Sequence, residues 1–354
     1  MRLILSQVTR TPAADRRSAF DAWLAGSKPW PSYPHLHARA HRLLVKTSSN
    51  IGYVPEICYV HPTEEWNDGL PVAIGGFADV YRAELNGHTV ALKKLRVFSS
   101  DMTDQGRAKM KMLCREAMIW QHLEHPNILQ FLGIDCDLYA GQWCLVSLWM
   151  ENGTIMRYLK KRQPPADVNV INYMLYEIAQ GLAYLRWENI VHGDLRGANI
   201  MIDEYHHVRL TDFGLASFAE TTRGPSAQTG KGGSIQFMAP ELHDPMRFGF
   251  PRYETTPSTD MYAFACVCYE MYTGHAPWHK EEKHDAAVIL RVCKGDRPVR
   301  PTPEECSGKV LTEEVWRLID ACWTQAANKR PDVREIARFL ASILQPMVSQ
   351  SFLP

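Results

Sequence analysis

The pattern of apolar and polar positions divides the 354-residue chain into a strand-rich part followed by a helix-rich part. Between about residues 71 and 149, short apolar runs alternate with turn residues, which is typical of β-strands. Asn86-Gly87 separates the runs 80–85 and 88–93, and this dipeptide between two such runs predicts a β-hairpin. Residues 128–134 and 143–149 predict two further strands. Residues 104–124 repeat apolar side chains every three to four positions, which predicts one helix ending before His125-Pro126.

After about residue 153 the apolar spacing becomes mostly helical. We predict helices over 166–188, 258–273, 284–294, 312–323 and 332–344. The most apolar stretch, Met261 to Tyr272, predicts a buried core helix. Since no apolar run approaches the roughly 18 residues needed to span a bilayer, we expect no membrane segment.

Residues 1–65 differ from the rest of the chain and are predicted to form an N-terminal extension. Stretches 14–24 and 36–46 have helical character, and a proline-rich joint at 28–34 separates them. No residue pattern here indicates chemistry, so a packing or linker role is expected. Residues 346–354 are predicted as a short C-terminal tail.

Charge and cysteine content limit the partners, the metal or disulfide sites and the cellular setting that we expect. Lysine plus arginine equals aspartate plus glutamate at 39 each, so neither nucleic acid nor a membrane surface is an expected partner. The nine cysteines are scattered, odd in number and form no pair of CxxC motifs, which argues against a disulfide framework or a zinc site. A reducing, cytoplasmic setting is therefore expected.

The segment from Ile190 to Asp212 holds the most informative polar residues. Asp194, Arg196 and Asn199 lie in a turn-rich stretch, and Asp212 follows at the end of the segment. Phosphoryl transfer needs oxygen ligands for magnesium, a carboxylate that orients the attacking hydroxyl, and positive charge on the phosphates. Each residue alone is compatible with a turn or a cap, but their joint spacing favours phosphoryl transfer.

This segment resembles the eukaryotic protein kinase family. The run from His192 to Asn199 is similar to the family's HRDxKxxN catalytic loop, and Asp212-Phe213-Gly214 matches its DFG motif. The resemblance implies Asp194 as catalytic base with Arg196 beside it, and Asn199 and Asp212 as magnesium ligands. Upstream, Val90 to Lys93 resembles the VAIK strand, which implies that Lys93 contacts the ATP phosphates and pairs with Glu116.

The resemblance covers roughly residues 70 to 345. It implies an α+β, bilobal protein-kinase fold, with a small β-rich N-lobe containing one main helix and a larger helical C-lobe. We therefore predict a kinase domain over 66–345, divided into lobes at about 66–150 and 151–345. Glu241 and Arg330 match the family's buried ion pair, and Asp260 matches the helix aspartate that holds the catalytic-loop backbone. Trp278 and Cys322-Trp323 resemble the tyrosine-kinase-like group of mostly Ser/Thr kinases.

The glycine-rich loop departs most from the family pattern. Of the three glycines in GxGxxGxV only Gly75 is kept, and if Ala78 adopts a positive φ the strain is about 1 kcal/mol. Ser147 occupies the gatekeeper position, which implies an open back pocket provided that Trp120 does not fill it. The resemblance assigns the nucleotide to Ala73, Ile74, Gly75, Gly76, Phe77, Ala78, Val80, Ala91, Lys93, Ser147, Leu148, Met150, Asn199, Met201 and Asp212.

Gly193 replaces the arginine of the HRD motif, which in the family receives an activation-segment phosphate. We therefore expect activity without phosphorylation of Thr221, Thr222, Ser226 or Thr229. The basic run of Arg107, Lys109, Lys111 and Arg115 is expected to be a solvated helix face, with docking of an acidic partner as the alternative.

An ATP- and Mg²⁺-dependent Ser/Thr kinase acting on protein substrates is the leading functional hypothesis. Gly233-Ser234 lies where Ser/Thr kinases carry Gly-Thr. The first alternative is a catalytically weak kinase-fold scaffold or pseudokinase, which the alanines of the glycine-rich loop favour. The second alternative, an enzyme acting on a small molecule, is disfavoured by Ala239-Pro240-Glu241, because this motif builds a peptide platform in the family.

Overall fold

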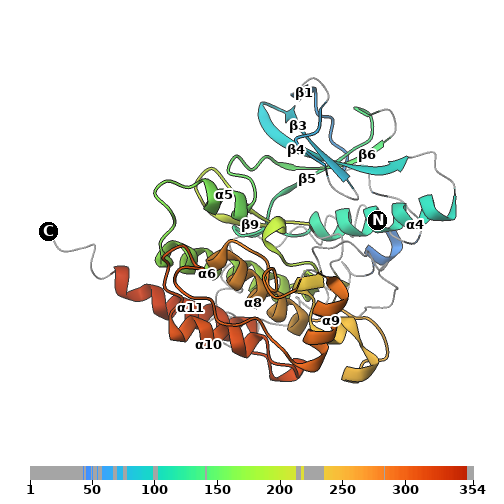
Figure 1. Ribbon diagram of the computed structural model, residues 1–354. Coiled ribbons are helices and arrows are strands. Elements are labelled where there is room, and N and C mark those ends of the chain that lie inside the picture. The colour runs from blue at the N-terminus through green and yellow to red at the C-terminus, as the bar shows by residue number, and fades with distance from the viewer. Residues whose placement is uncertain are drawn as a thin grey trace, which may run out of the picture. The chain divides into compact units, whose positions relative to one another are not determined.

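The computed structural model describes residues 43, 45–48, 50, 54, 58–66, 70–74, 78–98, 103–139, 142–212, 217–218, 235–282 and 284–348. These residues belong to two compact units, the first ending at Glu151 and the second starting at Asn152 (Figure 1). In this described part of the chain, no helix has both the length and the apolar character needed to cross a bilayer.

The first unit contains an antiparallel sheet of six strands in the order β1-β3-β4-β6-β5, with β2 paired to β3. The strands are β1 (Glu64–Trp66), β2 (Ala73–Ile74), β3 (Ala78–Leu85), β4 (His88–Phe98), β5 (Phe131–Asp135) and β6 (Gln142–Leu148). The predicted hairpin is confirmed, because Asn86 and Gly87 join β3 to β4 with φ values of 52° and 79°. Positive φ at both positions matches the right-handed twist of the flanking strands.

The two faces of this sheet carry different side chains. One face forms an apolar cluster of Tyr81, Ala83, Val90, Leu92, Cys144 and Val146. Because side chains alternate along a strand, Val80, Ala91, Lys93 and Ser147 lie on the opposite face. In the register of the sheet, Val80 is opposite Lys93 and Ala91 is opposite Ser147. Four of the residues predicted to bind nucleotide therefore share one face.

Helix α4 (Asp104–Trp120) is the main helix of the first unit and contacts β4 and β5. It begins at Thr103, whose hydroxyl accepts a hydrogen bond from the N–H of Gly106. It ends four residues earlier than predicted, because the chain turns after Trp120 and buries Leu123. The basic run on this helix is not uniformly solvated, since burial lowers the pKa of Arg115.

The first unit also includes part of the predicted extension. Residues 43, 45–48 and 50 are helical, and Tyr59 forms a parallel bridge with Ile134 of β5. The helical character predicted for 36–46 is thus present at residues 43, 45 and 46, whereas 14–24 and 28–34 lie outside the described residues. The domain start at residue 66 stays a prediction.

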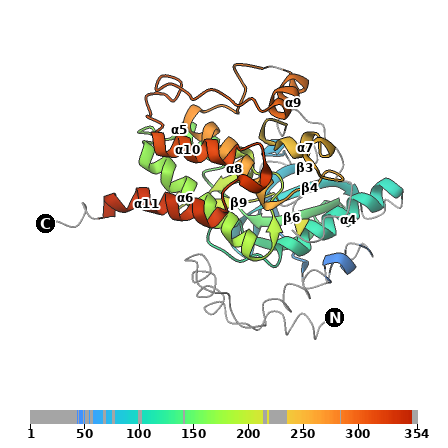
Figure 2. The same ribbon diagram turned by 90° about the horizontal axis from the view of Figure 1, so that it is seen from below.

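The second unit is mainly helical. Its α-helices are α5 (Ile155–Lys161), α6 (Val168–Trp187), α7 (Pro240–His243), α8 (Pro257–Thr273), α9 (Asp285–Lys294), α10 (Glu313–Cys322) and α11 (Val333–Val348). Its short strands pair as β7 (Ile190–Val191) with β10 (Ser217–Phe218), and β8 (Ile200–Ile202) with β9 (Val208–Leu210). Helix α11 packs along α6 and α10 along α8, as Figures 1 and 2 show.

All five predicted helices of this unit are present within a few residues of their expected bounds. Helix α8 is buried along nearly its whole length, which confirms the predicted core helix. Helix α5 was not predicted, because its seven residues are too few to show a helical repeat.

Candidate active site

Lys93 on β4 and Glu116 on α4 form an ion pair within the first unit. The Nζ atom of Lys93 lies 3.0 Å from Oε1 of Glu116, and the two side chains are 24% and 8% exposed. Because the lysine is on a strand and the glutamate on a neighbouring helix, the distance depends on how α4 packs against the sheet. The structure therefore contains the predicted pair, in a partly buried setting where the charges interact more strongly than in water.

The turn between β7 and β8 brings Asp194 and Asn199 together in the second unit. Nδ2 of Asn199 donates to the backbone oxygen of Asp194 at 2.8 Å and to its Oδ2 at 3.0 Å. Nε of Arg196 lies 3.5 Å from the same carboxylate oxygen. No hydrogen bond among the described residues uses Oδ1 of Asn199, so this oxygen is left as a potential metal ligand.

Asp212 follows β9 and has a left-handed backbone with φ 67°. The N–H of Thr211 donates to the backbone oxygen of Asn199 at 3.1 Å, which holds this end of the segment beside the turn that contains Asn199. Aspartate tolerates the left-handed region better than most residues, and such strain is common at functional sites. The oxygen-only donor set of Asn199 and Asp212 suits Mg²⁺. Phe213 and Gly214 lie outside the described residues.

The backbone of the turn between β7 and β8 is held by Asp260 of α8. Its carboxylate accepts the N–H of His192 at 2.8 Å and that of Gly193 at 3.0 Å. Burial raises the pKa of Asp260, while His192 and the two N–H groups oppose the shift. Burial also lowers the pKa of His192, whose Nδ1 accepts the N–H of Asp194 at 3.3 Å. Gly193 has φ 81°, a conformation that glycine adopts without strain.

Comparison with known proteins identifies this arrangement. The family model for protein tyrosine and serine/threonine kinases matches residues 70–340. The chain belongs to this protein kinase family. The tyrosine-kinase-like resemblance is confirmed by the kinase's relatives, which include Ser/Thr protein kinases and a Raf homologue.

Three relatives illustrate the degree of similarity. The kinase is 28% identical to serine/threonine-protein kinase VIK of Arabidopsis thaliana, over 84% of this chain and 65% of the relative. It is 29% identical to serine/threonine-protein kinase STY46 of the same plant, over 78% and 44%. It is 30% identical to the Raf homolog serine/threonine-protein kinase of Caenorhabditis elegans, over 79% and 33%. The chain thus spans less than two thirds of each of these relatives.

Glu270 is a second carboxylate of α8 that holds the catalytic loop, and the sequence did not reveal this role. Its Oε2 accepts the N–H of Gly197 at 3.0 Å. A Cβ atom at position 197 would lie only 2.6 Å from Oε2 of Glu270 and from Cγ of Met156, so any other residue would force these side chains to move. Burial raises the pKa of Glu270, with the Gly197 N–H and Arg196 opposing it. The available signal was a single acid within the apolar stretch from Met261 to Tyr272.

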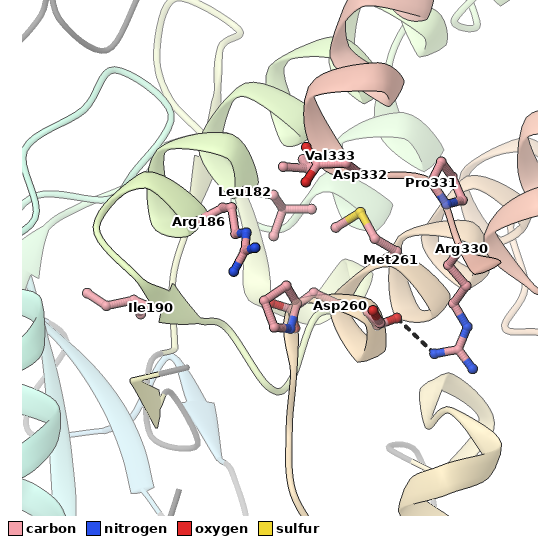
Figure 3. A pocket seen from close by; sticks show the side chains of 11 residues that line it. Leu182, Arg186, Ile190, Asp260, Met261, Arg330, Pro331, Asp332 and Val333 are labelled. Carbon is pink, nitrogen blue, oxygen red and sulfur yellow. Dashed lines mark hydrogen bonds between the residues drawn. The ribbon is translucent and has the colours of Figure 1, made fainter. Parts of the chain in front are cut away.

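A buried ion pair joins Glu241 and Arg330 in the second unit. Arg330 donates to both carboxylate oxygens of Glu241, at 2.6 and 2.8 Å. Their side chains are 2% and 0% exposed. Asp260 and Arg330 also line a hollow of about 130 Å³, together with Leu182 and Arg186 of α6 (Figure 3). The predicted catalytic residues are absent from its lining, so this hollow is not part of the candidate active site.

The glycine-rich loop and the adenine edge are described in part. Ala78 begins β3 opposite Leu95, so its backbone is extended and a positive φ is not required. Ala73 and Ile74 are exposed on β2, while Gly75, Gly76 and Phe77 lie outside the described residues. Leu148 ends β6, and Met150 is 8% exposed. In the second unit, Met201 of β8 forms a bridge with Thr154.

The surroundings of Ser147 bear on the predicted back pocket. Ser147 is 5% exposed and lies opposite Phe131 in the sheet. The indole of Trp120 stacks on Phe131 with ring centroids 5.1 Å apart, and its Nε1 donates to the backbone oxygen of Leu129 at 2.6 Å. This stack places Trp120 against the residue opposite Ser147, whereas the predicted open pocket requires that Trp120 does not fill this space. The open pocket stays a prediction.

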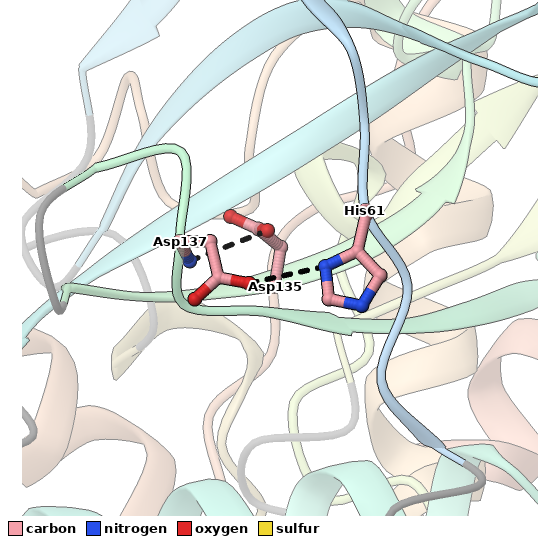
Figure 4. Close-up of side chains that lie close together, drawn as sticks. All are labelled: His61, Asp135 and Asp137. Carbon is pink, nitrogen blue, oxygen red and sulfur yellow. Dashed lines mark hydrogen bonds and ion pairs between the residues drawn. The ribbon is translucent and has the colours of Figure 1, made fainter.

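A second group of potential metal ligands lies at the end of β5, where His61, Asp135 and Asp137 come together (Figure 4). The carboxylate of Asp135 accepts the N–H groups of Asp137 and Leu138 at 3.4 and 3.2 Å. His61 pairs with Asp137 at 3.1 Å, and their side chains are 71% and 69% exposed. A turn and a surface ion pair explain this group, so we assign no metal to it.

Proposed function

We propose that this kinase transfers the γ-phosphate of ATP, bound with Mg²⁺, to serine and threonine hydroxyls of protein substrates. The proposal rests on the arrangement of Asp194 and Asn199. The Asp194 side chain is 17% exposed, and one of its oxygens is fixed by the Asn199 amide. A carboxylate that is held in place yet still reached by solvent suits a base that receives the proton of a substrate hydroxyl.

The other residues have distinct roles in this proposal. Lys93, held by Glu116, binds and orients the phosphates. Asn199 and Asp212 would hold Mg²⁺, which would supply positive charge to the phosphate oxygens. Arg196, at 3.5 Å from Asp194, adds charge near the site of transfer.

The preference for serine and threonine is supported by the names of the relatives. Gly233-Ser234, the sequence feature that favoured it, lies outside the described residues.

Transfer of radiolabel from γ-labelled ATP to casein and myelin basic protein tests the proposal. The matched control is Asp194→Asn, which keeps the size of the side chain and removes the base. We expect the variant to lose on the order of 10²- to 10⁴-fold in rate while its nucleotide affinity stays near that of the wild type. Phosphoamino-acid analysis should find phosphoserine and phosphothreonine; phosphotyrosine alone would contradict the proposed acceptor.

Other outcomes separate the alternatives. No transfer by the wild type, together with unchanged nucleotide binding in Asp194→Asn, would support a scaffold in place of an enzyme. Consumption of ATP with label only in a small molecule of a metabolite mixture would support the small-molecule alternative. Either result would overturn the proposed protein kinase activity.

A further inference from the structure

Helix α4 is buried on a side that faces away from the sheet. Glu116 and Trp120 mark its sheet-facing side, because they contact Lys93 of β4 and Phe131 of β5. At 3.6 residues per turn, Cys114 and Met118 lie about 120–160° around the helix from both of them. Nevertheless Cys114 is 0% and Met118 is 3% exposed. A second element must therefore cover this side of α4.

The described helical residues 43, 45–48 and 50 form the element beside α4. Burial raises the pKa of the Cys114 thiol, and a hydrogen bond with the side chain of Ser48 opposes this shift. Val45 and Ser48 lie about one helical turn apart and are 4% and 3% exposed, whereas Leu43 is 59% exposed. Figures 1 and 2 both show this short blue helix alongside α4. One side of the segment is thus buried and the other faces solvent.

The same segment is anchored further along at the free edge of β5. The N–H of Val60 donates to the backbone oxygen of Ile134 at 2.9 Å, and Val54 is 1% exposed. Gly133 makes this approach possible, because a Cβ atom there would lie 2.5 Å from the carbonyl oxygen of Cys58. The described residues between 43 and 60 therefore connect α4 to β5 by contacts at both ends.

We propose that the described residues between 43 and 60 hold α4 in the position where Glu116 meets Lys93, with Val45 and Ser48 as positioning residues. This inference rests on the proposed function, because it assigns the segment a role in binding ATP phosphates. The Lys93–Glu116 separation is 3.0 Å, and a hydrogen bond is lost beyond about 3.5 Å. A shift of α4 by roughly 1 Å is therefore enough to break the pair.

Val45→Asp tests the contact by placing a charge at its buried surface. The matched control is Leu43→Asp, which puts the same charge on the exposed side of the same helix. Two measurements are made on the full chain: the alkylation rate of Cys114, followed by peptide mass spectrometry, and the affinity for Mg²⁺-ATP. In the wild type we expect slow alkylation, because Cys114 is 0% exposed and burial raises the pKa of its thiol to about 11.

We expect Val45→Asp to raise Cys114 alkylation and to weaken Mg²⁺-ATP binding roughly 10-fold or more, since a hydrogen bond to a charged group is worth about that factor. Leu43→Asp should change neither quantity. In a Glu116→Gln background, Val45→Asp should weaken nucleotide binding no further, because both changes remove the same interaction. An equal loss in both backgrounds would overturn the proposal, as would fast alkylation with unchanged affinity.

A reversible variant separates positioning from a failure to fold. In Val45→Asp/Ser48→Cys, the introduced thiol lies where the wild-type hydroxyl contacts Cys114. Oxidation with diamide should form a disulfide between the introduced thiol and Cys114 and restore nucleotide affinity. Reduction with dithiothreitol should break this disulfide and lower the affinity again. Adding Cys114→Ser should remove this redox response. Failure to cross-link would contradict the contact itself, and cross-linking without restored affinity would contradict the positioning role.

These measurements do not depend on phosphate transfer. If the wild type binds nucleotide but transfers no phosphate, the proposed enzyme activity fails while the positioning role can still be supported. If transfer is normal and Val45→Asp leaves affinity unchanged, the positioning role alone fails.

Discussion

Replacing Arg330 by methionine gives a quantitative test of the buried ion pair with Glu241. The guanidinium makes two hydrogen bonds to this carboxylate, and it also donates at 2.9 Å to the backbone oxygens of Ser258 and Thr324. Methionine keeps much of the aliphatic volume but leaves a carboxylate that is 2% exposed without its counter-charge. Removing one partner of such a pair costs about 3–5 kcal/mol. In a domain of this size that corresponds to a melting temperature lower by about 6–20 °C.

The assay is unfolding by heat and by urea, followed by circular dichroism. Arg317→Met is the matched control, because Arg317 pairs with Glu313 on the surface, with side chains 77% and 51% exposed. This control should cost less than about 1 kcal/mol. A double variant, Arg330→Met/Glu241→Leu, should be more stable than Arg330→Met, since it removes the isolated charge. If Arg330→Met and Arg317→Met were destabilised equally, the reasoning from burial would be wrong.

Three further predictions concern Gly133, His243 and the activation segment. Gly133→Ala should destabilise the first unit by about 1–3 kcal/mol, because its Cβ atom would lie 2.5 Å from the carbonyl oxygen of Cys58; urea unfolding with an unchanged midpoint would contradict this. Burial lowers the pKa of His243 to about 4, so its contribution to stability is present above the ordinary value near 6.5 and is lost as the pH falls toward 4. The loss should reach about 3 kcal/mol, and urea midpoints between pH 7.5 and 4 should fall less steeply in His243→Leu. Finally, protein shown by mass spectrometry to lack phosphate at the four activation-segment sites should transfer phosphate as fast as modified protein, and activity that appeared only after modification would refute the argument from Gly193.

The sequence predicted the parts of the candidate site that depend on short-range spacing. Asp194 and Asn199 lie within one turn, and their hydrogen bonds follow from that proximity. The pairing of Lys93 with Glu116 depends on packing between a strand and a helix, and here only the family resemblance indicated it. Ala78 shows a limit of the motif comparison, because its strand position requires no positive φ.

The features that the sequence did not reveal depend on contacts between distant segments. Glu270 holds Gly197 across 73 residues, and an acid in an apolar helix does not indicate which backbone group it will meet. Similarly, Val45 and Ser48 show no pattern of their own, and their burial becomes evident only once α4 lies beside them. Helix α5 was missed for a different reason, since its seven residues are too few for periodicity to appear.

The two carboxylates of α8 attach the predicted catalytic loop to one helix at two points. Asp260 and Glu270 are ten residues apart, so their anchor points are about 15 Å apart along one rigid rod. Because the loop is attached to this helix at two points, the helix restricts its motion, although it contributes no reacting group. Thermal inactivation should therefore coincide with the melting of α8 and not precede it. Substitutions around this helix, at a distance from Asp194, would then change the temperature at which activity is lost.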